Sequence, residues 1–134
     1  MTLHRVVLAV TGLVYLVIAV ASLVVPDAMA AGLGYRLDNA DAHNEYAAVY
    51  VGLWTATALI FAIAARRPDD RTLLLVCLLL VAGQVVGRTA GIALHGLPSA
   101  RLLPSIVVEI VGTLVLGWLL RRASFTAAPG HGNR

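Results

Sequence analysis

Four long apolar stretches, each about as long as a bilayer is thick, constrain the fold of this chain more than any other feature. A helix needs about 20 mostly apolar residues to cross about 30 Å of hydrocarbon. Inside hydrocarbon every backbone polar group must be paired, and a membrane β-barrel would need at least about eight alternating strands. The sequence therefore predicts an all-α bundle of four transmembrane helices in up-down-up-down order. The expected spans are residues 6–25, 46–65, 73–94 and 102–120, with a long loop over 26–43.

The composition agrees with a membrane protein and excludes a water-soluble domain. Of the 134 residues, 60% are hydrophobic and only 13% are charged, whereas soluble domains average about 25% charged residues. A chain of this length forms a single domain, which we expect to cover residues 1–123. Residues 124–134 contain Pro129 and two glycines and are predicted to form a flexible tail.

All ten basic residues are arginines, and their distribution predicts the orientation of the bundle. Seven flank one side of the predicted spans and two flank the other, and the more basic side stays in the cytoplasm. We therefore expect a multi-pass protein of the cytoplasmic membrane with both termini in the cytoplasm. The arginines form no stripe with interleaved aromatic residues, so nucleic acid is not an expected partner. The seven are Arg5, Arg66, Arg67, Arg71, Arg121, Arg122 and Arg134.

Two opposite charges lie within the predicted spans, where each would be costly alone. Arg88 lies six residues before Leu94, and Glu109 lies seven residues after Leu102. With a rise of about 1.5 Å per residue, these positions are about 9 Å and about 10 Å below the external boundary. Because the two spans are antiparallel neighbours, we expect Arg88 and Glu109 to pair.

Other polar side chains gather in the same half of the predicted membrane. Gln84 lies one turn from Arg88 on the same helix face. The further members are Asn44, Glu45 and Tyr50 on the second span and Tyr15 on the first. This grouping predicts a polar pocket that opens toward the external side. The pocket is either a binding site for a lipid-like or quinone-like amphiphile or a structural clamp between helices.

Two ridges of small residues predict where the helices approach most closely. Apolar burial does not drive helix association in lipid, so small residues spaced four apart favour close backbone contact. One ridge lies on the second span and one on the third, and we expect them to pack together. The residues are Ala48, Gly52 and Ala56 on the second span and Gly83, Gly87 and Gly91 on the third.

The sequence contains no convincing pattern of catalytic or metal-binding residues. His43, Glu45 and His95 supply too few closely spaced ligands for zinc, which takes about three or four from the protein. The single cysteine, Cys77, lies in an apolar run without a second thiol, which favours a buried side chain over a nucleophile. We therefore predict no catalytic residue, no metal and no cofactor.

The segment 44–54 reads Asn-Glu-Tyr-Ala-Ala-Val-Tyr-Val-Gly-Leu-Trp. It resembles the second-span signature N-E-x-R-A-x-Y-G-G of a family of uncharacterised bacterial membrane proteins with four helices, which is loosely similar to DoxX-like proteins. Later family motifs, G-R, D-G-x-P-S and a glutamate, correspond to Gly87-Arg88, residues 95–99 and Glu109. The resemblance covers most of residues 44–109.

Three positions depart from the family pattern. Ala47 stands in place of an arginine, Val51 in place of a glycine and His95 in place of an aspartate. The resemblance implies that one ion pair has been lost while the Arg88–Glu109 pair remains. It also implies a four-helix membrane fold, and the DoxX-like relatives imply quinone or redox chemistry in the membrane, which is analogy at the level of fold.

The preferred function is a non-catalytic or accessory membrane protein that binds a lipid-like or quinone-like amphiphile in the predicted pocket. Arg88 would orient the polar head of the ligand and Glu109 would hold Arg88. The alternatives are a structural subunit of a larger membrane complex and a DoxX-like membrane oxidoreductase. The expected partners are membrane lipid, an amphiphilic ligand and either further copies of the chain or a larger complex.

Overall fold

The computed structural model describes residues 3–125, and these are helical apart from short connections. Four helical stretches are long and apolar enough to cross a membrane, which confirms the predicted all-α fold with four spans. The elements are α1 (Leu3–Val24), α2 (Pro26–Gly32), α3 (Ala40–Tyr46), the π-helical segment η1 (Ala47–Leu53), α4 (Trp54–Arg66), α5 (Arg71–His95) and α6 (Leu103–Phe125). The second span is a single helical stretch, Ala40–Arg66, that α3, η1 and α4 build together.

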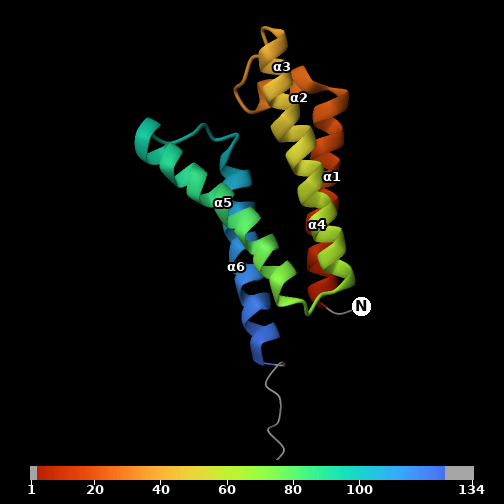
Figure 1. Ribbon diagram of the computed structural model, residues 1–134. Coiled ribbons are helices and arrows are strands. Elements are labelled where there is room, and N and C mark those ends of the chain that lie inside the picture. Colours follow the sequence, from red (N-terminus) through yellow and green to blue (C-terminus); the bar gives the residue numbers. More distant parts are fainter. Residues whose placement is uncertain (1–2, 126–134) are drawn as a thin grey trace, which may run out of the picture.

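The four spans form two helix pairs, α1 with α4 and α5 with α6 (Figure 1). The pairs meet at the end that carries the start of α1 and the turn between α4 and α5, which we call the turn end. They diverge toward the opposite end, where α2, α3 and the 96–102 connection lie (Figure 1), which we call the loop end. The bundle is therefore closed at the turn end and open toward the loop end.

Local capping explains where several helices begin and end. The Asp70 carboxylate accepts hydrogen bonds from the backbone N–H groups of Thr72 and Leu73 and starts α5. Gly96, at φ 85°, ends α5 in a backbone conformation that favours glycine.

The segment 26–43 is more ordered than the loop that the sequence predicts, because it contains α2 and the start of α3. Pro26 occupies the first turn of α2, where its missing N–H costs no hydrogen bond. The Asn39 side chain accepts a hydrogen bond from the backbone N–H of Ala42 and caps α3.

The predicted tail begins too early, because α6 continues through Phe125. The rest of that predicted tail, residues 126–134, lies outside the residues that the structure describes.

The best-packed part of the molecule lies in the half near the turn end, where all four spans contribute side chains. Phe61, Leu74 and Leu119 are fully buried there, and Cys77 is buried beside them as the sequence predicts. The core cluster comprises Leu8, Tyr15, Ala58, Phe61, Ala64, Ala65, Leu74, Cys77, Val81, Leu116, Leu119 and Ala123. Most other apolar side chains of the spans are exposed on the outside of the bundle, as a lipid-facing surface requires.

Side-chain contacts at the turn end hold the helices together, both between the two helix pairs and within each pair. Nδ1 of His4 lies 3.6 Å from the Asp69 carboxylate on the α4–α5 turn, and the His4 ring makes a T-shaped contact with Trp118 of α6 at 6.5 Å. The Arg122 guanidinium lies over the same Trp118 ring at 4.1 Å. Nε of Arg5 donates to the backbone oxygen of Ala65, 3.1 Å away, and joins α1 to α4.

The closest helix approach differs from the one that the sequence predicts. A Cβ on Gly12 of α1 would lie 3.0 Å from Cβ of Phe61 and 3.2 Å from the backbone oxygen of Ala58, so α1 and α4 are in near contact there. A Cβ added to any glycine of the two predicted ridges would meet no atom of another helix within 4 Å. The expected contact is therefore absent at Gly52, Gly83, Gly87 and Gly91, and Ala48 and Ala56 are exposed. The reason is that α5 leans away from α4 toward the loop end (Figure 1).

The substitution Gly12→Leu tests the close approach of α1 and α4. A larger side chain must push the backbones apart, and overpacking of this kind costs about 1–3 kcal/mol. We expect a lower thermal unfolding midpoint in detergent. Gly117→Leu is the matched control, since a Cβ at Gly117 meets nothing within 4 Å. Equal midpoints for the two variants would contradict this packing.

Candidate functional site

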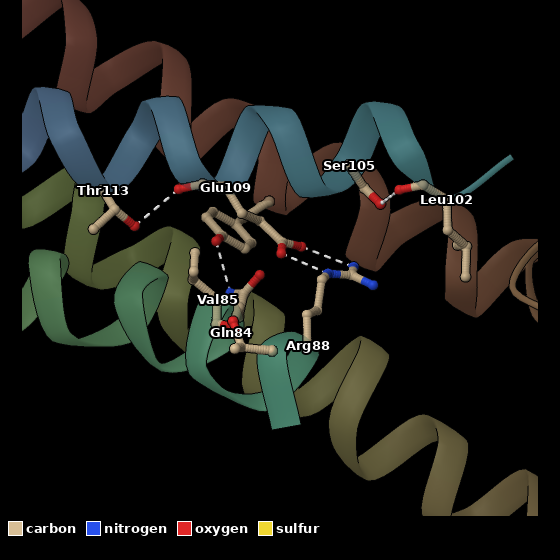
Figure 2. Close-up of polar contacts among 9 residues, drawn as sticks. Gln84, Val85, Arg88, Leu102, Ser105, Glu109 and Thr113 are labelled. Carbon is tan, nitrogen blue, oxygen red and sulfur yellow. Dashed lines mark hydrogen bonds and ion pairs between the residues drawn. The ribbon is translucent and has the colours of Figure 1, made fainter. Parts of the chain in front are cut away.

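The centre of the candidate site is the ion pair that the sequence predicts between α5 and α6. Nε of Arg88 donates to Oε2 of Glu109 at 2.5 Å, and Nη2 donates to Oε1 at 2.8 Å (Figure 2). Glu109 is the more buried member of the pair, with its side chain 10% exposed against 30% for Arg88. This two-bonded geometry is the strongest that an arginine and a carboxylate can adopt, so the pair offsets much of the cost of placing two charges in a span.

Arg88 keeps unused hydrogen-bonding capacity. A guanidinium has five N–H donors, and the pairing with Glu109 uses one on Nε and one on Nη2. Within residues 3–125 the third nitrogen, Nη1, makes no hydrogen bond, and Figure 2 shows it pointing away from Glu109. The site therefore combines a fixed guanidinium with N–H groups that are free to bind another oxygen.

A second polar contact connects α5 to α1. Nε2 of Gln84 donates to the Tyr15 hydroxyl at 2.8 Å, one turn from Arg88 and toward the turn end. The Tyr15 ring is itself stacked on Phe61 at 5.8 Å and meets Trp54 edge-on at 5.8 Å. Gln84 is thus held in place by a ring that belongs to the core, and the structure brings these two members of the predicted cluster into contact.

An unbroken series of ring contacts runs along the α1–α4 pair from the loop end into the core. Tyr35 contacts Tyr50 at 6.1 Å, Tyr50 stacks on Tyr46 at 4.6 Å, and Tyr50 contacts Trp54 at 5.0 Å. Hydroxyl groups anchor its outer members: Tyr50 donates to Tyr35 at 3.4 Å, and Tyr46 donates to Ser22 of α1 at 3.2 Å. The six rings are Tyr35, Tyr46, Tyr50, Trp54, Tyr15 and Phe61, and we call them the aromatic series.

The π-helical segment η1 contains Tyr50, a central member of this series. Its wider turn is marked by the N–H of Trp54, which bonds the carbonyl of Val49 five residues back. A π-helical turn changes which side chains share a helix face, and such segments recur at functional sites. Here Tyr46, Tyr50 and Trp54, spaced four apart, contact one another in sequence.

A cavity of about 430 Å³ lies between the two helix pairs in the open half of the bundle. Its wall on the second span includes Tyr50 and Trp54, and its wall on α5 includes Gln84 and Arg88, with Glu109 of α6 behind them. The full set of lining residues is Val49, Tyr50, Leu53, Trp54, Thr57, Leu80, Gly83, Gln84, Gly87, Arg88 and Glu109.

Arg88 also borders a second cavity of about 350 Å³ toward the loop end. That cavity lies between the last turns of α5 and the start of α6, and Gly91, His95 and Ile106 are among its lining residues. Among residues 3–125, Arg88 is therefore the one residue that lines both cavities.

Three predicted members of the polar cluster, Asn44, Glu45 and Tyr15, do not line the main cavity. Asn44 and Glu45 are exposed on α3, whereas Tyr15 is buried and contributes no lining surface, although it contacts the lining residues Gln84 and Trp54. Within the described residues Glu45 makes no ion pair with Arg88. Among the described residues, Glu109 is therefore the acidic partner of Arg88.

Several lining residues are absent from the site that the sequence predicts. Trp54 is one of them, although helical spacing in the sequence places it in a broad common sector with Glu45 and Tyr50. The others, Val49, Leu53, Thr57 and Leu80, carry no polar pattern that would distinguish them from lipid-facing residues. In the described part of the chain, no group of three or more His, Cys, Asp or Glu side chains is placed to hold a metal ion.

These features define a small multi-pass membrane protein with an ion pair and an adjoining cavity inside its spans. The chain belongs to the family described as Domain of unknown function (DUF4345), whose model matches residues 3–120. This match confirms the predicted membership of an uncharacterised family, while the relation to DoxX-like proteins stays a prediction. No similar protein is found among curated proteins, and no similar chain among solved structures.

A double-mutant cycle on Arg88 and Glu109 tests the energetic role of the pair. Breaking a buried pair on one side typically costs about 3–5 kcal/mol, because an uncompensated charge remains. We expect Arg88→Leu alone to lower the thermal midpoint in detergent strongly, and Arg88→Leu with Glu109→Leu to recover most of that loss. Strictly additive effects would show that the two side chains do not depend on each other.

Proposed function

We propose that this protein binds a small amphiphile in the cavity beside Arg88 and acts as a non-catalytic or accessory protein of the cell membrane. The observation that carries this proposal is the position of the cavity: an ionisable pair inside the spans borders an open space instead of being sealed on all sides. Ionisable groups at this depth mark binding sites in many membrane proteins. The volume of about 430 Å³ falls within the usual range of ligand sites, about 300–1,000 Å³.

The division of polar and apolar groups in the cavity supports an amphiphilic ligand. Its polar groups are concentrated on one side at Gln84, Arg88 and Glu109, whereas Val49, Leu53 and Leu80 line other parts of it. A ligand with a polar head and an apolar body would satisfy both surfaces.

The absence of side chains at Gly83 and Gly87 also supports this proposal. Both glycines line the cavity, and a side chain at either position would meet no atom within 4 Å. Their lack of a side chain therefore leaves space open instead of bringing two helices together. Larger residues there would reduce the volume available to a ligand without disturbing the packed core.

A structural role for the pair is the second candidate. The two hydrogen bonds between Arg88 and Glu109 hold α5 against α6 regardless of any ligand. In this case the protein would be a structural subunit of a larger membrane complex, and the exposed apolar surface would contact other proteins. The two candidates differ in whether the cavity is occupied in the membrane.

The proposed orientation places the turn end in the cytoplasm. Six arginines and two aspartates lie near that end, and two arginines and four acidic residues lie near the loop end. Basic flanks are retained on the cytoplasmic side of the membrane. The turn-end charges are Arg5, Arg66, Arg67, Arg71, Arg121, Arg122, Asp69 and Asp70, and the loop-end charges are Arg36, Arg101, Asp27, Asp38, Asp41 and Glu45.

Labelling of introduced cysteines tests this orientation. In intact spheroplasts we expect Leu97→Cys to react with a membrane-impermeant maleimide and Asp69→Cys to react only after permeabilisation. Both positions are more than four-fifths exposed. The parent protein, whose single thiol at Cys77 is fully buried, is the background control. The reverse labelling pattern would overturn the proposed orientation.

Mass spectrometry of molecules that co-purify with the protein tests the binding function. After gentle detergent extraction, we expect the wild-type protein to carry a small amphiphile and Gly87→Leu, which fills the cavity, to lose it. Gly117→Leu is the matched control, because Gly117 also has open space around it but does not line the cavity. If all three proteins carry the same molecules in the same amounts, the cavity is not the binding site.

A further inference from the structure

We propose that the ligand of this cavity is an uncharged molecule with a planar ring that bears hydrogen-bond acceptor oxygens. In the bound state its ring faces Tyr50 and Trp54 and an acceptor oxygen meets the free N–H groups of Arg88. This inference rests on the proposed function and adds the chemical class of the ligand.

The charge balance of the cavity selects a neutral ligand. Arg88 and Glu109 neutralise each other, and no other lining residue is ionisable as an acid or base near neutral pH. An anionic headgroup would approach a guanidinium whose charge is already compensated and a carboxylate that repels it. Moving the anionic headgroup out of water would also cost free energy, because the cavity offers no net positive charge to compensate for the lost hydration. An uncharged ligand avoids both penalties.

The second-span wall selects a ring over an acyl chain. Tyr50 and Trp54 lie 5.0 Å apart with their planes inclined at 56°, and both line the cavity while remaining only half-buried. Aromatic faces pack favourably against another ring in offset or edge-to-face geometry. Tyr15 meets Trp54 edge-on and Tyr46 stacks on Tyr50, so both rings of this wall are packed against neighbouring rings.

The α5 wall offers donors, and so selects acceptors on the ligand. Nη1 of Arg88 is free in the described structure, and the Gln84 amide uses one of its two N–H groups on Tyr15. The cavity wall also carries acceptors, namely the side-chain carbonyl of Gln84 and the remaining lone pairs of Glu109, whose two oxygens each accept one bond from Arg88. The N–H groups of Arg88 and Gln84 that stay free, however, can be satisfied only by an acceptor on the ligand, such as a carbonyl or ether oxygen.

Tryptophan fluorescence provides a direct test, because the chain has two tryptophans and only Trp54 lines the cavity. Trp118→Phe leaves Trp54 as the reporter of the cavity. Trp54→Phe leaves Trp118 at the turn end as the reporter of general partitioning into the bilayer. Both proteins are placed in phosphatidylcholine nanodiscs and titrated with an alkyl para-benzoquinone, whose neutral ring carries two carbonyl oxygens and quenches indole fluorescence.

The inference predicts saturable quenching of Trp54 and only a gradual, unsaturated decrease for Trp118. Adding Gly87→Leu to Trp118→Phe should weaken the apparent affinity at least about tenfold, which corresponds to about 1.4 kcal/mol, whereas adding Gly117→Leu should leave it unchanged. Neither phosphatidylglycerol nor a fatty acid should compete with the quinone. Glu109→Gln, which removes the compensating charge, should instead allow competition by the fatty acid.

The failure of this inference can be distinguished from the failure of the proposed function. Equal, unsaturated quenching of both tryptophans would overturn the ring-bearing ligand. If the co-purified molecule is then an acyl lipid that Gly87→Leu releases, the binding function stands and only the ligand class is wrong. If the quenching of Trp54 by the quinone does not saturate, and if the wild-type protein and Gly87→Leu carry the same co-purified molecules, both proposals are wrong.

Discussion

The pairing of a guanidinium and a carboxylate inside the membrane is the constraint on which the rest of this structure depends. Either charge alone would be costly at that depth, so α5 and α6 must keep the register that brings Arg88 and Glu109 to the same height. That register fixes the α5–α6 pair as a unit. The α1–α4 pair has no ion pair within its spans in the described part of the chain and depends on close packing at Gly12 instead.

The two kinds of contact produce a bundle with unequal halves. Near the turn end, Phe61, Leu74 and Leu119 pack into a common core, and His4 and Trp118 join the first span to the last. Toward the loop end the pairs separate (Figure 1), and the space between them is bordered by glycines, aromatic rings and the ion pair. The hydrophobic core and the cavity therefore lie at different depths in the bundle. A change at a cavity residue outside the ion pair, such as Gly87, need not disturb that core.

The sequence is sufficient for the features that follow from length and charge. The thickness of hydrocarbon predicts the four spans, and a constant rise per residue places Arg88 and Glu109 at one height. The sequence is insufficient for features that depend on how helices lean. Glycines permit close contact but do not require it, so Gly83 and Gly87 cannot be distinguished from packing residues by their spacing. Regular α-helical periodicity would place Glu45 on the same helix face as Tyr50. The π-helical segment η1 begins at Ala47, between these two residues, and interrupts that periodicity.

Arg88 can both hold α5 against α6 and contribute to a binding site. Glu109 engages only two of the five N–H donors of Arg88, and the clamp determines where the remaining donors point. A lone arginine in this half of the membrane would move toward water or demand an anion, whereas a paired one stays in place without attracting charge. The carboxylate thus converts a charged residue into a fixed, nearly neutral donor group facing an aromatic wall. On this view the ion pair supplies both the register of the helices and the polarity of the cavity, and removing either partner would change both.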